Sequence, residues 1–146
     1  ELNAAYVEAI EDDRLEEWPS FFARECVYKI IPRENYDRGL PMTIMYCNTP
    51  GMLRDRVVAH RKANIFPPHY SRHLISNLRI KSVEGDVVSA QTSYVVLQTR
   101  HGGDATVYNA GKYVDRIVFE DGQPKFRERI VVCDSFRIAT LLVTPI

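Results

Sequence analysis

Three long runs of strand-forming residues near the end of the sequence limit what this chain can fold into. The runs are Val87–Arg100, Ala105–Phe119 and Lys125–Phe136. All three are rich in Val, Ile, Thr, Tyr and Phe, which favour strands. The breaks between them contain glycines that supply positive φ, and Asp121-Gly122 in the second break is a strong β-hairpin signal. The pattern predicts an antiparallel meander.

Successive residues of the first run point to opposite faces of the expected strand, and one face is more apolar than the other. Val88, Ala90, Thr92, Tyr94 and Val96 fall on one face, and Ser89, Gln91, Ser93 and Val95 fall on the other. Strands of this length would each extend roughly 40 Å at ~3.3 Å per residue, and such long strands twist and coil rather than stay flat. We therefore expect a strongly curved sheet whose concave side is covered by the rest of the chain.

Helices are predicted mainly in the first half of the sequence. Leu2–Ile10 has apolar residues at helical spacing. Asp13 and Glu16 resemble a capping box that opens a second helix, Arg14–Phe22, with Pro19 in its first turns. The aromatic residues of that segment, Trp18, Phe21 and Phe22, are expected in the core. Thr49 as N-cap and Pro50 at the first helical position predict a third helix that ends near Ala63.

Shorter strands are predicted between the helices. Cys26–Ile31 alternates and ends at a proline, Met42–Cys47 is expected to form an edge strand after a polar loop from Arg33, and His73–Val83 leads into the meander. The length of 146 residues fits one domain over residues 1–146. The order of elements predicts an α+β domain with a curved mixed or antiparallel sheet wrapped around N-terminal helices.

The composition of the chain argues against a nucleic-acid-binding or membrane protein. Lys plus Arg and Asp plus Glu number 19 each, so there is no basic footprint for nucleic acid or a membrane surface. No transmembrane span or signal peptide is recognisable. The three cysteines, Cys26, Cys47 and Cys133, are widely spaced and form no C-x-x-C motif, which favours a reducing compartment. We expect a cytoplasmic protein.

The residues suggest two kinds of active site. His60, His69 and His73 suggest a metal site, but no nearby carboxylate completes a ligand set, so we expect a surface His69 and a partly buried, hydrogen-bonded His73. A cone-shaped pocket for acid–base chemistry could instead be lined by the following residues: Tyr28, His73, Tyr94, Tyr113 and Asp115. Equally, the tyrosines can be core residues and Asp115 an ion-pair partner on the sheet.

Charge clusters are most often solvated faces, but here they suggest a third possibility, a subunit interface. Basic residues crowd the predicted third helix: Arg54, Arg56, Arg61 and Lys62. Arg127 and Arg129 on the last strand are expected to share a face with Val131 and Cys133, a mixture of charge and apolar surface that suits contact between subunits.

Several segments together resemble the small (β) subunits of Rieske-type aromatic-ring-hydroxylating dioxygenases. The segments are Asp12–Phe22, Cys26–Ile30, Pro32–Asn35, Gly51–Val57, Arg72–Ile80, Tyr108–Asp115 and Arg129–Ser135. They span nearly the whole chain, and within the family they are most similar to small subunits of terephthalate dioxygenase or salicylate hydroxylase.

This resemblance implies an NTF2-like cone and a mainly structural role in the hydroxylation of an aromatic carboxylate in aromatic catabolism. It implies that the Rieske [2Fe-2S] cluster and the mononuclear Fe(II) lie in a large α subunit, usually in an α3β3 assembly that also contains other β subunits. It gives no catalytic, cofactor-binding or metal-binding residue to assign to this chain. The alternative is a free-standing NTF2-like isomerase or dehydratase that uses the cone pocket.

Overall fold

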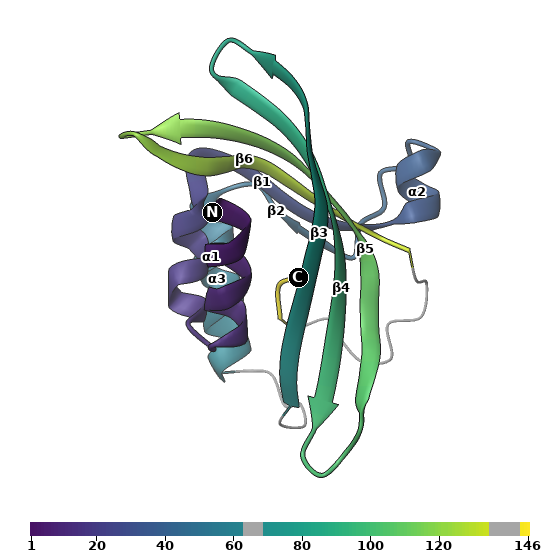
Figure 1. The fold of residues 1–146 in the computed structure, drawn as a ribbon. Coiled ribbons are helices and arrows are strands. Elements are labelled where there is room, and N and C mark those ends of the chain that lie inside the picture. Colours follow the sequence, from purple (N-terminus) through teal and green to yellow (C-terminus); the bar gives the residue numbers. More distant parts are fainter. Residues whose placement is uncertain (63–68, 135–143) are drawn as a thin grey trace.

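A computed structural model describes residues 1–62, 69–134 and 144–146. The helical elements are α1 (Leu2–Glu11), the 3-10 helix η1 (Leu15–Phe21), α2 (Arg33–Asp37) and α3 (Pro50–Lys62). The strands are β1 (Phe22–Pro32), β2 (Met45–Cys47), β3 (His69–Glu84), β4 (Val87–Arg100), β5 (Ala105–Glu120) and β6 (Gln123–Cys133). One curved sheet contains all six strands, with α1 and α3 against one face and α2 beyond the other (Figure 1).

The sheet confirms the predicted α+β cone and the meander. Its strand order is β2-β1-β6-β5-β4-β3, and every neighbouring pair is antiparallel except β1 with β6. The β5–β6 turn has φ of 52° at Asp121 and 76° at Gly122, the two positive values that a two-residue hairpin turn of this kind requires. Of the predicted third run, residues 135 and 136 lie outside the described part of the chain.

The first and third predicted helices are confirmed. In α3 the backbone N–H of Met52 donates to Thr49 Oγ1 at 3.1 Å, so Thr49 caps this helix as expected. The predicted last residue, Ala63, lies outside the described residues.

The predicted capping box is wrong. The second segment is the 3-10 helix η1, with Pro19 in its second half rather than its first turns, and it has no side-chain cap. Asp13 adopts a φ of 57°, and both carboxylates of the expected box turn to Arg61 of α3. Arg61 donates to Glu16 at 2.8 and 2.9 Å and to the Asp13 carboxylate at 2.7 Å. An arginine from a distant helix therefore takes the carboxylates that local sequence would assign to a cap.

This contact gives a pH prediction. The hydrogen bonds from Arg61 lower the pKa of Glu16 to about 2, so the stabilisation is complete above the ordinary pKa and is lost as pH falls from about 4.5 towards 2. We expect Glu16→Gln to lower the melting temperature at pH 7, with the difference from wild type closing at acid pH. Thermal denaturation against pH checks this, with Glu25→Gln as a control because Glu25 has no ion-pair partner among the described residues. A difference that persists unchanged at pH 2 would contradict it.

The region after β1 differs in detail from the prediction. The expected edge strand is confirmed as β2 but is only Met45–Cys47. The expected polar loop contains α2, whose side chains are all at least partly exposed and therefore show no apolar periodicity. Ion pairs four residues apart, Arg33 with Asp37 and Arg38 with Glu34, support this short helix instead.

The main core fills the concave side of the sheet. Tyr6, Trp18, Phe22, Tyr28 and Phe126 meet there mostly edge to face, with ring centroids 5.0–6.3 Å apart. Trp18 is fully buried and Phe22 nearly so, while Phe21 is half-buried against the same core, as expected for the aromatic segment. Under α2 on the other face lies a smaller cluster: Ile31, Ile130, Val132, Tyr36 and Val114.

Candidate functional site

All five residues of the hypothetical acid–base pocket point into the concave interior, but they are packed rather than open. Tyr28, Tyr94, Tyr113 and Asp115 are at most 1% exposed and His73 is 7% exposed. The pairing register accounts for this, because inward positions on neighbouring strands lie side by side: Thr92 with Tyr113 and Val131, and Ala90 with Asp115 and Arg129. The predicted alternation along β4 is thereby confirmed from Ala90 to Val96.

Arg129 occupies the centre of this interior. Its Nε and Nη2 donate to the two carboxylate oxygens of Asp115 at 2.9 and 2.8 Å, and Nη2 also donates to Asn3 of α1. The guanidinium carbon lies 3.8, 4.2 and 4.3 Å from the ring centroids of Phe126, Tyr113 and Tyr6. Burial disfavours the charged form, but Asp115 outweighs that effect, so the pKa of Arg129 lies above its ordinary value.

The predicted exposed interface at this arginine is therefore wrong. Arg129 does share a face with Val131 and Cys133, but that face is the buried one. Arg127 lies at a bulge between the β5–β6 pairs Arg116–Glu128 and Ile117–Phe126, and it is exposed. The bulge separates two arginines that simple alternation places together.

A second polar group sits further along the sheet. The Tyr94 hydroxyl donates to Asn109 Oδ1 at 2.6 Å and lies 3.4 Å from Cys133 Sγ, while its ring stacks on Tyr113 at 4.6 Å between centroids. Burial raises the pKa of Tyr94 and of Tyr113, so both hydroxyls stay protonated at neutral pH. Sequence analysis missed Asn109, which pairs with Val96 at an inward position of β5.

His73 is buried as predicted, but its ring lacks the predicted hydrogen bond. Its backbone N–H donates to Glu11, whose other oxygen accepts from Arg72 at 2.5 Å. Nδ1 lies 3.4 Å from the Glu11 carboxylate, and within the described residues neither ring nitrogen has a hydrogen-bond partner. Burial lowers the pKa of His73, so the ring is neutral at pH 7.

The other predicted histidines do not join His73 in a ligand set. His60 Nε2 lies 3.0 Å from Thr144 Oγ1, and His69 is half-buried at the start of β3 rather than on the surface. Among residues 1–62, 69–134 and 144–146, no group of three or more His, Cys, Asp or Glu side chains is placed to hold a metal ion. Cys26, Cys47 and Cys133 are buried free thiols.

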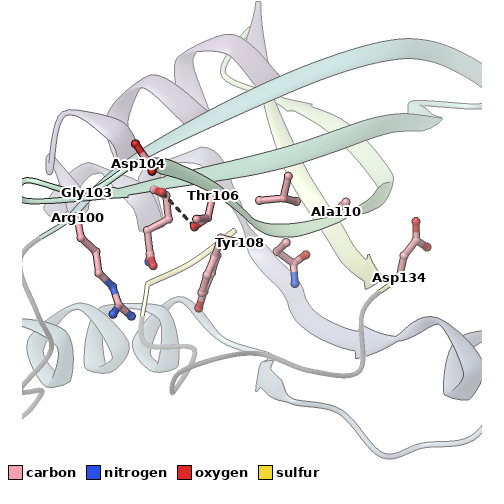
Figure 2. Close-up of a pocket in the computed structure, with 10 residues that line it drawn as sticks. Arg100, Gly103, Asp104, Thr106, Tyr108, Ala110 and Asp134 are labelled. Atoms are coloured by element: carbon pink, nitrogen blue, oxygen red, sulfur yellow. Dashed lines mark hydrogen bonds between the residues drawn. The ribbon is translucent and has the colours of Figure 1, made fainter.

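A pocket of about 550 Å³ lies beside the β4–β5 hairpin (Figure 2). Its lining residues are Gln98, Arg100, Gly103, Asp104, Thr106, Val107, Tyr108, Asn109, Ala110 and Asp134. The Thr106 hydroxyl donates to the Gln98 carbonyl at 3.4 Å across its wall. None of the five acid–base candidates lines this pocket. Tyr94 contacts its wall through the hydrogen bond to Asn109.

A curved mixed sheet closed by N-terminal helices and filled with side chains defines an NTF2-like domain. The family model described as the ring hydroxylating beta subunit matches residues 6–140, and the chain belongs to this family. This confirms the interpretation as a dioxygenase small subunit over that of a free-standing isomerase or dehydratase.

Individual relatives agree with the family. The chain is 43% identical to the anthranilate 1,2-dioxygenase small subunit of Burkholderia cepacia, over 99% of this chain and 90% of that protein. It is 38% identical to a terephthalate 1,2-dioxygenase terminal oxygenase beta subunit of Comamonas sp, over 99% of this chain and 94% of that protein. A crystal structure from Novosphingobium aromaticivorans, named as a beta subunit of an aromatic-ring-hydroxylating dioxygenase, is 54% identical with a TM-score of 0.90, covering 99% of this chain and 92% of that one.

Proposed function

We propose that this chain is the structural subunit of a multicomponent oxygenase and supplies no catalytic, cofactor-binding or metal-binding residue. The supporting observation is the filled cone, in which Asp115 is fully engaged by Arg129 and Tyr94 by Asn109. A general acid or base must reach a substrate proton, directly or through one water. Side chains that are buried and hydrogen-bonded to each other stabilise the fold and cannot reach a substrate.

The substrate class follows from the relatives. Anthranilate and terephthalate, after which two relatives are named, are both aromatic carboxylates. We infer that the complex containing this chain hydroxylates an aromatic carboxylate in aromatic catabolism.

The cofactors are assigned to the partner. An iron–sulfur cluster needs several closely placed Cys or His ligands, and a mononuclear iron of this kind needs two histidines and a carboxylate. The described residues offer neither set. We infer that both iron centres lie in the large subunit, that three large and three small subunits assemble, and that residues 1–146 form one domain of a cytoplasmic complex. No helix within the described part of the chain is long and apolar enough to cross a membrane.

Co-expression with the large subunit tests this function. We expect the two chains to co-purify, with iron and acid-labile sulfide found in the large subunit after the two are separated. Stoichiometric metal in the isolated small subunit, lost on replacing His69 and His73, would contradict the proposal. So would turnover by the small subunit alone.

His73 provides the sharpest single-residue test. Because its ring is neutral and its nitrogens have no hydrogen-bond partner in the described residues, His73→Gln should lower the unfolding free energy by only about 1 kcal/mol through altered packing. Turnover per assembled complex should stay within a few-fold of wild type. A general base at this position would instead lose roughly a hundredfold. Steady-state kinetics on size-selected complex, with a melting curve on the same sample, separates the two outcomes.

A further inference from the structure

The outer face of the sheet carries an apolar strip on the side opposite α1 and α3. The pairing register places Leu74, Val95 and Ala110 in one row. The next row contains Leu97 and Val107 together with Arg72, which is paired with Glu11 of α1. Tyr70 follows one row further along β3. We use the name outer strip for the six residues other than Arg72: Tyr70, Leu74, Val95, Leu97, Val107 and Ala110. The strip is largely accessible, since Tyr70, Leu74 and Val107 are 67%, 55% and 68% exposed. Helix α2 packs on this face over β1 and β6 instead.

Unpaired cations border the strip on the same face. Three further rows of outward-facing residues follow the Leu74 row. The first contains Lys112, the second contains Arg79 and Lys29, and the third contains Arg116. Glu128, beside Arg116, is the one carboxylate in these three rows. In the described part of the chain none of these four cations lies in an ion pair. Lys112 only overlies the Tyr36 ring, 5.4 Å from its centroid. The face is therefore apolar from Tyr70 to Leu74 and positive in the rows that follow Leu74.

These charges disfavour a second copy of the chain as the occupant. Two copies meeting through the same face would place like charges opposite each other, which opposes association. The chain's own carboxylates also offer few partners for these cations, because eleven of the nineteen form ion pairs among the described residues. The remaining eight are spread over the molecule: Glu1, Glu25, Asp55, Glu84, Asp86, Asp104, Glu120 and Glu128. Three of them, Glu25, Asp86 and Glu120, share a groove with Arg24 and Arg127.

We propose that the outer strip is the docking surface for the large subunit of the oxygenase, whose matching surface is apolar with acidic side chains on the side that meets the cations. Such a surface would cover the exposed apolar side chains and pair the unpaired cations. This inference rests on the proposed function, because it presumes that a large subunit binds this chain at all.

The apolar part is tested with Leu74→Asp combined with Val107→Asp. Both side chains are exposed, so the isolated subunit should keep its melting temperature, while affinity for the tagged large subunit should fall at least tenfold. Met42→Asp combined with Val58→Asp is the matched control, since these side chains are 73% and 50% exposed on other elements. The control should bind as wild type does.

The charged part is tested with Arg79→Glu combined with Arg116→Glu. Binding should weaken at least tenfold at low salt, with the difference shrinking as salt rises. Arg54→Glu with Lys62→Glu on α3 makes the same change in net charge and should have little effect.

The possible outcomes distinguish an error in the docking surface from an error in the proposed function as an oxygenase subunit. If wild type binds the large subunit and all variants bind equally, the docking surface is wrong and the function stands. If the strip variants lose only self-association of the small subunit, the strip joins copies of this chain and the inference is overturned. If wild type does not bind the large subunit, the proposed function fails as well.

Discussion

Replacing Asp115 with alanine should lower the unfolding free energy by about 3–5 kcal/mol, because it leaves the Arg129 guanidinium buried without its counter-ion. Both side chains of this ion pair are fully buried, so water cannot take the place of the carboxylate. The aromatic rings around Arg129 attract the cation but accept no strong hydrogen bond. Urea denaturation of the isolated subunit gives the measurement.

A double variant provides the control. Asp115→Leu with Arg129→Met removes both charges and keeps an apolar volume, and such replacements of buried pairs are often neutral or stabilising. It should therefore be more stable than Asp115→Ala, although Asn3 loses the donor that Arg129 provides. Equal loss in both variants would show that packing around the pair, rather than the unpaired charge, dominates.

The outcome also bears on function. If Asp115 served proton transfer, Asp115→Asn would abolish turnover in complexes that assemble and melt normally. With Asp115 serving the fold, each assembled complex should keep its turnover, and the yield of complex should fall.

The strands and two of the helices could be predicted because their signals are local. Asp121-Gly122 sets the β5–β6 turn, alternation sets the inward face of β4, and Thr49-Pro50 starts α3. Each depends on residues within a few positions of one another. The helix α2 was missed for the same reason, since its exposed surface leaves no periodic apolar pattern to read.

The central ion pair could not be predicted from local signals. Counting back from the hairpin turn pairs Glu120 with Gln123 and Ile117 with Phe126, and unbroken pairing would then place Asp115 opposite Glu128. The bulge at Arg127 shifts the register by one residue and brings Arg129 opposite Asp115 instead. A shift of one residue replaces a like-charge pair by an ion pair. Complementary charge one position beyond the expected partner is the signal in the sequence that could have revealed it.

The predicted capping box does not form because a residue distant in the sequence competes for its two carboxylates. Asp13 and Glu16 have the residue types of a cap, but Arg61, 45 residues after Glu16, donates to both carboxylates. A bidentate contact from a guanidinium is stronger than a bond from one backbone N–H. Tertiary contact therefore decides the conformation of this turn.

Gly111 of β5 leaves no room for a Cβ, and Gly111→Ala should be the most damaging glycine replacement. A Cβ there would lie 1.9 Å from the carbonyl oxygen of Val132 on β6 and 3.1 Å from the Tyr94 hydroxyl. Alanine ordinarily suits a strand better than glycine does, but here the obstacle is backbone of the neighbouring strand, which cannot rotate away.

We expect Gly111→Ala to cost about 3 kcal/mol and to lower the melting temperature by roughly 10 °C, because β5 and β6 must separate next to the Tyr94–Asn109–Cys133 group. Gly103→Ala in the β4–β5 turn is the matched control, since its nearest neighbour, the Arg100 carbonyl, would lie at an ordinary 3.5 Å. The control should change the unfolding free energy by no more than about 0.5 kcal/mol. Differential scanning calorimetry of both variants decides the matter: equal melting temperatures would mean that the strands already lie far enough apart at Gly111 to admit a methyl group.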